Sequence, residues 1–206
     1  MKDIKSSEYK EYKIYFPPKE KMEELWKIII DNTFKLNKVL KDTKRNYVAI
    51  VEINNKKYIL KEFRSEVVIP QRKIQTFFKK GEALTTLKNG QEAIKEGVTE
   101  LVEPLVAIIK KGIFIQKSFL LMEYIDGNIL RTNEDIDKVI EIIKKVHKLG
   151  RYHGDLNTSN FVKIENKIKM IDTQMKKEKY LYFKRIYDIF TLNELLPLGF
   201  GPSNLL

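Results

Sequence analysis

The chain has 206 residues, which is long enough for a sizeable hydrophobic core in one domain or in two small lobes. It contains no cysteine, which excludes a disulfide framework and a thiolate metal site, and it has no apolar run of about 18 residues that could span a membrane. Its 39 Lys and Arg residues against 28 Asp and Glu residues give a net charge of +11, which indicates either an anionic partner or simply a lysine-rich proteome.

The first third of the chain changes from an extended segment to a helix and then to strands. Residues 1–18 predict a strand or an extended arm, and because they lack the apolar core of a signal peptide, a cytoplasmic location is expected. Residues 19–32 predict a helix, because apolar side chains recur at i, i+3, i+4, i+7 and i+8. Strands are expected over residues 34–40, 47–53 and 57–63.

The third of these strands carries a lysine on a face that should be buried. Side chains alternate along a strand, so Lys61 shares one face with Ile59 and Phe63. A lysine in such a place needs an anionic partner to offset its lost hydration. The other interpretation is an ordinary strand-edge lysine in a chain full of lysines.

The middle of the chain predicts helices around one hairpin. A long helical region begins at Pro70 and is interrupted at Gly81. A hairpin follows over residues 104–124, and its second strand runs into the sequence Met-Glu-Tyr-Ile-Asp-Gly, which ends at Gly127. Residues 134–149 then predict an amphipathic helix that stops at a glycine.

Three oxygen-bearing side chains follow that helix at a suggestive spacing. Asp155 and Asn160 are five residues apart in one loop, and residues 161–171 predict a short hairpin that would bring Asp172 back beside Asn160. Taken singly, such residues usually serve loop turns. Together they supply a carboxylate for an attacking hydroxyl, and an amide and a second carboxylate for Mg²⁺, which is the inventory of phosphoryl transfer.

Only 34 residues follow Asp172. They predict one closing helix over residues 186–196 and a final loop, which is too little for the activation segment and peptide-docking helices of a protein kinase.

The order of these parts resembles the protein-kinase-like superfamily. Within it the chain is most similar to the lipopolysaccharide core heptose kinase family of Gram-negative bacteria. The segments that carry this resemblance are Tyr58–Lys61, Gly81–Leu87, Glu123–Gly127, Gly154–Phe161 and Ile171-Asp172. The small kinase/ATPase subunit of the tRNA threonylcarbamoylation complex is similar at His153–Asn160, but Thr173-Gln174 stands where that subunit normally has Phe-Gly.

The resemblance implies an α+β, two-lobed protein-kinase-like fold in a single domain. Residues 1–126 would form a β-rich N-lobe with an N-terminal extension, and residues 127–206 a small, mostly helical C-lobe. ATP and Mg²⁺ are the implied cofactors. Asp155 would be the catalytic residue, and Asn160 and Asp172 would bind the metal.

The N-lobe residues have implied roles in binding the nucleotide. Lys61, aimed by Glu82, would contact the α and β phosphates, with Glu92 and Glu96 as rivals for the role of Glu82. The backbone of Glu123 and Ile125 would bind the adenine edge.

Two further features bear on the resemblance. Residues 41–46 contain no glycine, whereas the usual kinase lid is rich in glycine; Lys41, Lys44 and Arg45 could supply side-chain contacts instead. Asp188 is expected to support the catalytic loop from beneath, as an aspartate in this region does in kinases.

The implied acceptor is a heptose hydroxyl of the lipopolysaccharide inner core, phosphorylated at the cytoplasmic face of the inner membrane. The partners would be this glycolipid and, peripherally, the acidic membrane surface, which the positive charge suits. Two alternatives remain: a nucleotide-binding pseudokinase, which the missing glycine lid supports, and an atypical kinase/ATPase associated with tRNA, which the charge permits. The sequence does not indicate an oligomeric state.

Overall fold

The computed structural model describes residues 4–178, 185, 186 and 188. They belong to two compact units, which are described separately below. The first unit comprises Met1–Gln91 and Glu103–Tyr124, and the second comprises Glu92–Val102 and Ile125–Leu206. The chain thus passes between the units at Tyr124, two residues before the expected end of the N-lobe, and residues 92–102 belong with the second unit.

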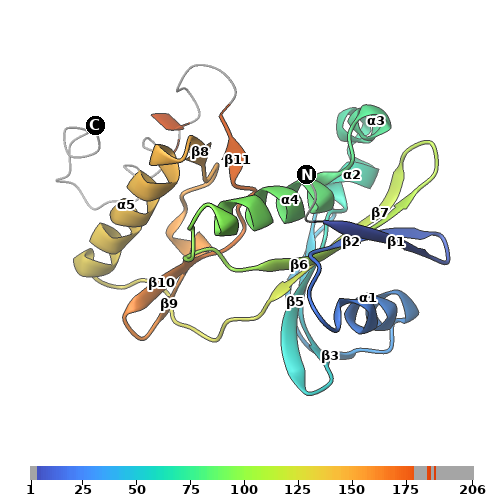
Figure 1. Ribbon diagram of the computed structural model, residues 1–206, viewed down its shortest axis with the longest axis horizontal. Helices are drawn as coiled ribbons and strands as arrows, with labels where there is room; N and C mark the ends of the chain where they lie inside the picture. The colour runs from blue at the N-terminus through green and yellow to red at the C-terminus, as the bar shows by residue number, and fades with distance from the viewer. Residues whose placement is uncertain (1–3, 179–184, 187, 189–206) are drawn as a thin grey trace. The chain divides into compact units, whose positions relative to one another are not determined.

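The first unit is built on a seven-stranded sheet in the order β1-β2-β6-β7-β5-β4-β3, with every neighbouring pair antiparallel (Figure 1). Its strands are β1 (Lys5–Tyr9), β2 (Tyr12–Phe16), β3 (Lys35–Asp42), β4 (Tyr47–Ile53), β5 (Lys56–Glu62), β6 (Pro104–Lys111) and β7 (Ile115–Glu123). The three strands and the hairpin expected in this region are confirmed. The N-terminal segment, expected to be one strand or an arm, is instead a hairpin that turns at Lys10, whose φ is +52°.

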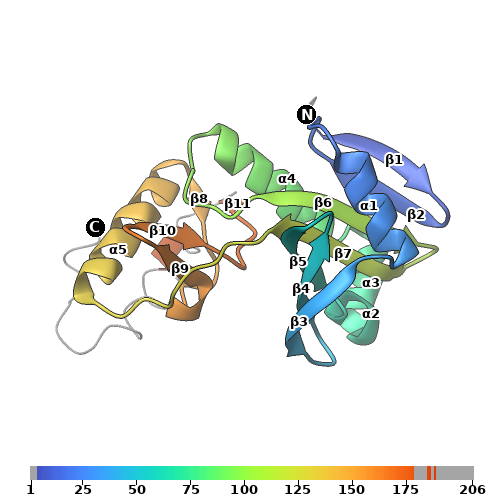
Figure 2. The same cartoon turned by 90° about the horizontal axis from the view of Figure 1, so that it is seen from below.

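Helices cover both faces of this sheet because its strands alternate between two cores. Helix α1 (Met22–Asp31) confirms the helix expected over residues 19–32, and its apolar stripe packs against Leu60 of β5 and Ile108 of β6 (Figure 2). The start of helix α4 (Glu82–Lys95) packs on the opposite face, against Phe63 and Leu120. Leu60 of β5 thus points into one core, and Phe63, directly after the strand, points into the other.

The helical region expected from Pro70 consists of separate pieces. Helix α2 (Ser65–Val68) precedes it, α3 runs over Pro70–Phe78, and α4 begins at Glu82. Ile69 between α2 and α3 has extended backbone angles, because the ring of a following proline disfavours the helical region. The break before α4 falls at Gly81, as expected, where φ is +89°.

The second unit has one long helix and small two-stranded sheets. Helix α5 (Asn133–Lys148) starts with a capping box, in which Thr132 accepts from the Asp135 N–H and the Asp135 carboxylate accepts from the Thr132 N–H. The other elements are β8 (Arg151–Tyr152), a 3₁₀ turn (Thr158–Asn160), β9 (Phe161–Ile164), β10 (Lys167–Met170) and β11 (Lys176–Lys177). Their apolar side chains form one core with α5, which includes Ile143, Leu156 and Phe161.

Two further expectations from the sequence concern the C-terminal helix and membrane-spanning segments. The closing helix expected over residues 186–196 and the loop after it lie largely outside the described residues. Across the part of the chain that the structure describes, no helix has the length and apolar character needed to cross a membrane.

Candidate active site

The second unit folds the expected loop and hairpin around Asn160. Strands β9 and β10 pair in antiparallel register, with Phe161 opposite Met170. The hairpin turns at Glu165-Asn166, and Ile171 N–H then donates to the Asn160 carbonyl oxygen at 2.8 Å. This bond places the backbone of Ile171, and hence the next residue, Asp172, beside Asn160. The sequence prediction for this hairpin is confirmed.

Asn160 also ties the two ends of the loop together. Its side chain is buried, and its Nδ2 donates to the Asp155 carbonyl oxygen at 3.0 Å. That bond fixes the amide so that Oδ1 is the atom left for a ligand. Asp155 itself is exposed. The loop therefore holds one carboxylate in solvent and one amide oxygen at a set orientation, five residues apart in the sequence.

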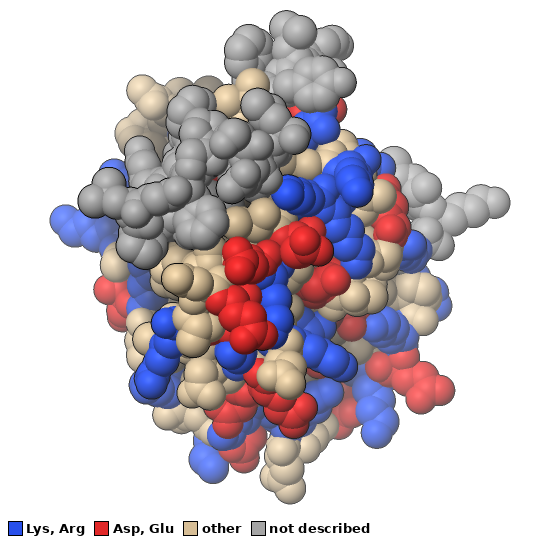
Figure 3. Space-filling view, turned by 90° about the vertical axis from the view of Figure 1, so that its left-hand side faces the viewer, with Lys and Arg blue, Asp and Glu red and all other residues tan. Residues whose placement is uncertain are grey.

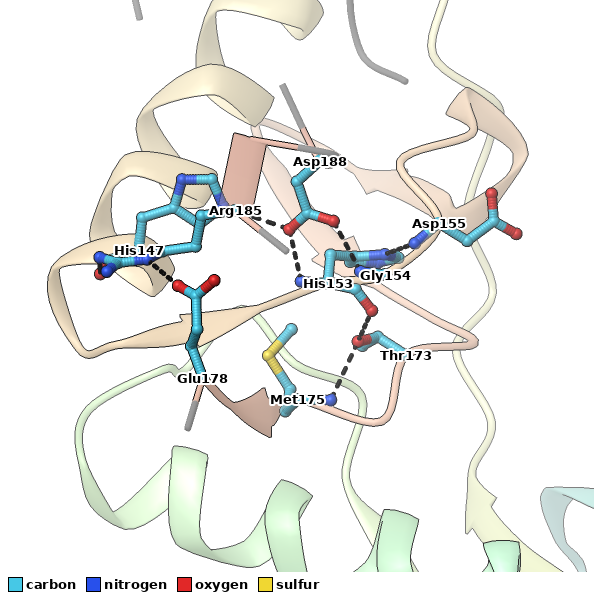
Figure 4. Close-up of polar contacts among 9 residues, drawn as sticks. All are labelled: His147, His153, Gly154, Asp155, Thr173, Met175, Glu178, Arg185 and Asp188. Atoms are coloured by element: carbon cyan, nitrogen blue, oxygen red, sulfur yellow. Dashed lines mark hydrogen bonds and ion pairs between the residues drawn. The ribbon is translucent and has the colours of Figure 1, made fainter. Parts of the chain in front are cut away.

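A buried aspartate supports this loop from behind. Asp188 is fully buried, and its two carboxylate oxygens accept from the backbone N–H groups of His153 and Gly154, each at 2.7 Å. His147 Nε2 lies 3.2 Å from Asp188 Oδ2. Figure 4 shows the carboxylate of Asp155 pointing away from this cluster. The expected support of the loop by Asp188 is confirmed.

His153 serves the loop as a packed, neutral ring. It is buried and stacks on Phe161, with the ring centroids 5.3 Å apart. Its Nδ1 accepts from the Asp155 N–H at 3.3 Å, so the neutral ring carries its proton on Nε2. Burial lowers the pKa of His153 from 6.5 to about 4. The imidazole is therefore neutral near pH 7 and positions the backbone of the loop.

The segment after Met170 turns sharply at its second residue. Asp172 is exposed and has a φ of +53°, in the left-handed region that aspartate tolerates better than most residues. Thr173 next to it is buried, donates to the His153 carbonyl oxygen at 2.8 Å, and accepts from the Met175 N–H at 3.1 Å. Thr173 thus holds the Asp172 turn against the loop that carries Asp155, in a position where Phe-Gly is common in kinases.

A buried arginine braces the same segment. Arg151 is fully buried and donates to the Met175 carbonyl oxygen at 2.7 Å. Its other nitrogens bind Glu96 at 2.7 Å and Glu92 at 3.0 Å, and Lys177 Nζ lies 2.9 Å from Glu96. The hydrogen bond from Arg151 lowers the pKa of Glu96 to about 2. Both rivals of Glu82 are therefore bound to Arg151 in the second unit.

In the first unit, Lys61 has the surroundings that the strand pattern predicts. Its exposed fraction is 8%, and its Nζ lies 5.0 Å from the centroid of the Phe63 ring on the same face. Aromatic faces attract cations, which offsets part of the lost hydration. Lys61 and Asp172 belong to different units, so their convergence on one nucleotide stays a prediction.

The glutamate expected to aim Lys61 has a different neighbour. Glu82 starts α4, and its carboxylate accepts from Arg72 of α3 at 2.8 Å. The pairing of Glu82 with Lys61 stays a prediction. Glu66 of α2 is more deeply buried, its Oε1 accepts from the Glu82 N–H at 2.8 Å, and burial raises its pKa.

The segment expected to bind adenine leaves β7 without regular structure. Strand β7 ends at Glu123, whose N–H donates to the Glu103 carbonyl oxygen at 3.0 Å, and Ile125 begins the second unit. The adenine-binding role of the Glu123 and Ile125 backbone stays a prediction. Gly127 is required here, because a Cβ on it would lie 2.4 Å from Val162 Cγ1.

The glycine-free tip between β3 and β4 is a tight turn. Thr43 Oγ1 accepts from the N–H groups of Arg45 and Asn46, and Thr43 N–H donates to the Asn46 carbonyl oxygen at 2.9 Å. The side chains of Lys41 and Lys44 are exposed there. Their contact with phosphates stays a prediction.

The donor set suits Mg²⁺ better than a transition metal. Among the described residues there is no group of three or more His, Asp and Glu side chains arranged to hold a metal ion. Instead, the two residues at the ends of the β9–β10 hairpin offer an amide oxygen, from Asn160, and a carboxylate, from Asp172. Such hard oxygen ligands, few in number, fit a magnesium ion that keeps waters and substrate phosphates among its ligands.

Sequence reasoning missed Arg151, Thr173 and Glu66. An arginine gives no signal in a chain with 39 basic residues, and its burial depends on Glu92 and Glu96, which lie 59 and 55 residues away. Thr173 was noticed only as a departure from Phe-Gly, and nothing in the sequence marks Glu66.

Comparisons with known proteins agree with this architecture. The family described as "Lipopolysaccharide core biosynthesis protein (WaaY)" matches residues 3–187. A relative from Escherichia coli (strain K12), named lipopolysaccharide core heptose(II) kinase WaaY, is 26% identical over 182 residues, which cover 82% of this chain and 76% of the relative. A second Escherichia coli protein of that name is 22% identical over 181 residues, covering 84% of this chain and 78% of the relative.

A solved structure is similar at the level of the fold. The structure of WaaP in complex with acyl carrier protein aligns with a TM-score of 0.62 at 13% identity, over 90% of this chain and 83% of that one. The α+β protein-kinase-like fold expected from the sequence is confirmed. With a match that spans residues 3–187, the chain belongs to the WaaY family of lipopolysaccharide core biosynthesis proteins.

Proposed function

We propose that this chain transfers the γ-phosphoryl group of ATP to a heptose hydroxyl of the lipopolysaccharide inner core, at the cytoplasmic face of the inner membrane. The observation that carries the proposal is the loop in which Asn160 bonds both the Asp155 carbonyl and the Ile171 N–H. The names of the Escherichia coli relatives, both heptose(II) kinases, support the acceptor.

Asp155 is the residue that handles the proton. Its exposed carboxylate accepts the hydrogen bond of the sugar hydroxyl, orients the oxygen toward the phosphorus, and takes the proton as the new P–O bond forms and the bond to the leaving ADP breaks. The backbone of this residue is held by Asn160 and by His153, which limits how far the carboxylate can move. Such positioning is most of what a protein contributes to phosphoryl transfer.

Asn160 Oδ1 and the Asp172 carboxylate would hold Mg²⁺, and Lys61 would contact the α and β phosphates. Bound Mg²⁺ supplies neutralisation of the phosphate charge. The turn at Asp172 is held by Thr173 and by the Arg151 bond to Met175, and the bond from Ile171 N–H to the Asn160 carbonyl oxygen holds the backbone before it beside Asn160.

One face of the molecule carries acidic and basic side chains together. On the face shown in Figure 3, acidic side chains gather near the centre, with lysines and arginines around and between them. Nucleic-acid surfaces instead cluster basic residues in a patch or stripe. The described residues on that face therefore do not form a basic patch of this kind.

The substitution Asp155→Asn tests the proposal. It removes the proton acceptor but keeps the size of the side chain, so transfer from ATP to dephosphorylated lipopolysaccharide core should fall about 10²- to 10⁴-fold. ATP binding, measured by equilibrium titration, should stay near that of the unsubstituted protein. The matched control is Asp137→Asn, the same change at an exposed aspartate on α5, which should leave transfer unchanged.

Two results would contradict the proposal. Phosphoryl transfer that persists in Asp155→Asn would show that this carboxylate is not the proton acceptor. Faster transfer to tRNA or to a protein than to the lipopolysaccharide core, in assays run side by side, would show that the proposed acceptor is wrong. ATP binding with no transfer to any of the three would indicate a regulatory nucleotide-binding module.

A further inference from the structure

Helix α3 presents bulky apolar side chains to solvent. Ile74, Phe77 and Phe78 are 60%, 54% and 82% exposed. Their spacing of three and four residues places Ile74 on one side of the helix with both phenylalanines. A helix in a globular protein normally turns such a stripe toward the core. Here the side chain that faces inward is the polar Thr76, which is buried.

The turn between β6 and β7 adds to this apolar surface within the same unit. Ile113 at the turn is 72% exposed, and the ring of Phe114 lies 6.3 Å from that of Phe77. Thr76 fixes the two segments together, because its Oγ1 accepts from the Ile115 N–H at 3.1 Å and its carbonyl oxygen accepts from Lys111 Nζ at 2.8 Å. Figures 1 and 2 both show α3 beside the end of the β6–β7 hairpin.

Two lysines lie directly beside these apolar groups: Lys73 Nζ is 5.8 Å from the centroid of the Phe114 ring, and Lys111 Nζ donates to the Thr76 carbonyl oxygen. Neither residues 67–81 nor residues 104–122 contain an aspartate or a glutamate. The two segments carry the following basic residues: Arg72, Lys73, Lys79, Lys80, Lys110, Lys111 and Lys117. Acidic groups from elsewhere in the unit pair with two of them: Glu82 with Arg72, and Glu11 with Lys110. The charge of this surface is therefore strongly positive.

We propose that α3 and the β6–β7 turn form a docking surface that inserts into an anionic lipid bilayer. Lysines at its edge would pair with headgroup phosphates, and Phe77, Phe78 and Ile113 would enter the boundary between headgroups and acyl chains. Side chains as exposed as Phe78 and Ile113 stand off the protein surface, which suits a bilayer better than the concave site that a protein partner usually fills. The proposal rests on the proposed function only in that the acceptor there is a membrane glycolipid.

Co-sedimentation of the whole chain with vesicles tests this surface without any phosphoryl transfer. We expect binding to vesicles of phosphatidylcholine with phosphatidylglycerol, and weaker binding to phosphatidylcholine alone. The double substitution Phe77→Ser with Phe78→Ser should lower the partition coefficient about tenfold or more. Lys79→Gln with Lys80→Gln should lower it about fivefold for each lysine removed.

Matched controls lie on strand β3, where Leu36 and Leu40 are 50% and 49% exposed. Leu36→Ser with Leu40→Ser, and Lys35→Gln with Lys38→Gln, make the same chemical changes away from the proposed surface and should leave binding unchanged. Equal loss in both pairs of variants, or no binding of the unsubstituted chain to anionic vesicles, would overturn the proposal. Binding of an acidic protein through Phe77 and Phe78 without vesicle binding would also overturn it, in favour of a protein partner.

The outcome is separable from that of the proposed function. Transfer to a deacylated, water-soluble core oligosaccharide needs no bilayer, so the Phe77→Ser with Phe78→Ser variant should keep that activity while losing activity on core embedded in anionic vesicles. Vesicle binding without transfer would leave the docking surface standing and reject the kinase assignment. Transfer to soluble core without vesicle binding would support the kinase assignment and reject the docking surface.

Discussion

The two units keep charged side chains away from water by different means. In the first unit, Lys61 and Glu66 are buried beside a large sheet, where apolar neighbours such as Phe63 and Leu120 make up the core. In the second unit, Asp188 and Arg151 are fully buried, and each is bonded to backbone atoms of the segments that carry the candidate catalytic groups.

This difference indicates how each unit is stabilised. The first unit gains most from apolar burial on two faces of a seven-stranded sheet. The second has one smaller apolar core, and its loops are held by charge-assisted hydrogen bonds, which are about twice as strong as neutral ones. Substitution of Lys61 in the first unit should therefore affect activity alone, whereas substitution of a buried charge in the second unit should affect both stability and activity.

The largest effect is expected at Asp188. Asp188→Ala removes the acceptor of the His153 and Gly154 N–H groups, which should lower the free energy of unfolding by about 3–5 kcal/mol. Phosphoryl transfer should fall with it, because the same groups shape the loop before Asp155. Urea denaturation and the transfer assay measure the two effects.

Two variants sharpen this prediction. Asp188→Asn keeps one oxygen acceptor and should cost less than Asp188→Ala. Asp137→Ala, at an exposed position on α5, should change the unfolding free energy by no more than about 0.5 kcal/mol. If Asp188→Ala is as stable as Asp137→Ala, the contrast between the units is wrong.

Lys61 should show the opposite behaviour. Lys61→Met keeps the length of the side chain beside Phe63, so the unfolding free energy should change by less than about 1.5 kcal/mol. Loss of a cation from the phosphates should reduce transfer about 10²- to 10³-fold. Lys57→Met, at an exposed position of the same strand, is the control and should retain transfer. A Lys61→Met protein that transfers phosphate normally would remove Lys61 from the site.

The contrast also explains which parts could be predicted from the sequence. The burial of Lys61 follows from strict alternation along β5, and the hairpin after Asn160 follows from two short β-rich runs around Glu165-Asn166. Both depend on residues a few positions apart. The break between α2 and α3 also has a local cause in the sequence, because Pro70 restricts the backbone of Ile69.

The rest depends on partners that are distant in the sequence. The burial of Arg151 requires Glu92, on the last turn of α4, and Glu96, just after that helix ends; both belong to the second unit although α4 starts in the first. No local pattern encodes such a division of one helix. Asp188 was predicted only through the family resemblance, since its acceptor role depends on backbone groups 34 and 35 residues away.

A smaller effect is expected for Arg151, together with a change in pH dependence. Arg151→Met removes the bond to the Met175 carbonyl and should cost about 1–3 kcal/mol, because Glu92 and Glu96 can turn toward water. Arg151→Met should also reduce transfer by loosening the Asp172 turn. Arg131→Met, at an exposed position before α5, should do neither.

The pH test uses the pKa of Glu96, which the hydrogen bond from Arg151 first, and contact with Lys177 second, lower from 4.5 to about 2. A carboxylate with a depressed folded-state pKa contributes stability above its unfolded pKa and loses it as pH falls through the folded one. The unsubstituted protein should therefore lose this contribution between pH 4.5 and about 2. In Arg151→Met most of this loss should be absent, and the part due to Lys177 should remain. If the unfolding free energies of the two proteins change in parallel across this pH window, the Arg151–Glu96 bond does not contribute as proposed.

The smallest effect concerns His153 and occupies a different pH window. Burial lowers its pKa from 6.5 to about 4, so between these values the unfolded chain binds a proton that the folded chain excludes. Stability from this residue is therefore complete above pH 6.5 and falls as pH drops from 6.5 to 4, by at most about 1.4 kcal/mol per pH unit. His153→Asn keeps an acceptor for the Asp155 N–H but cannot titrate, so its unfolding free energy should be flatter across this range. Urea denaturation at half-unit steps of pH separates the two windows, because Arg151→Met should alter the slope of the unfolding free energy against pH only below 4.5, and His153→Asn should alter it only above 4. An unchanged slope in His153→Asn would mean that the ring is open to protonation in the folded loop, and that its stacking on Phe161 does not exclude water.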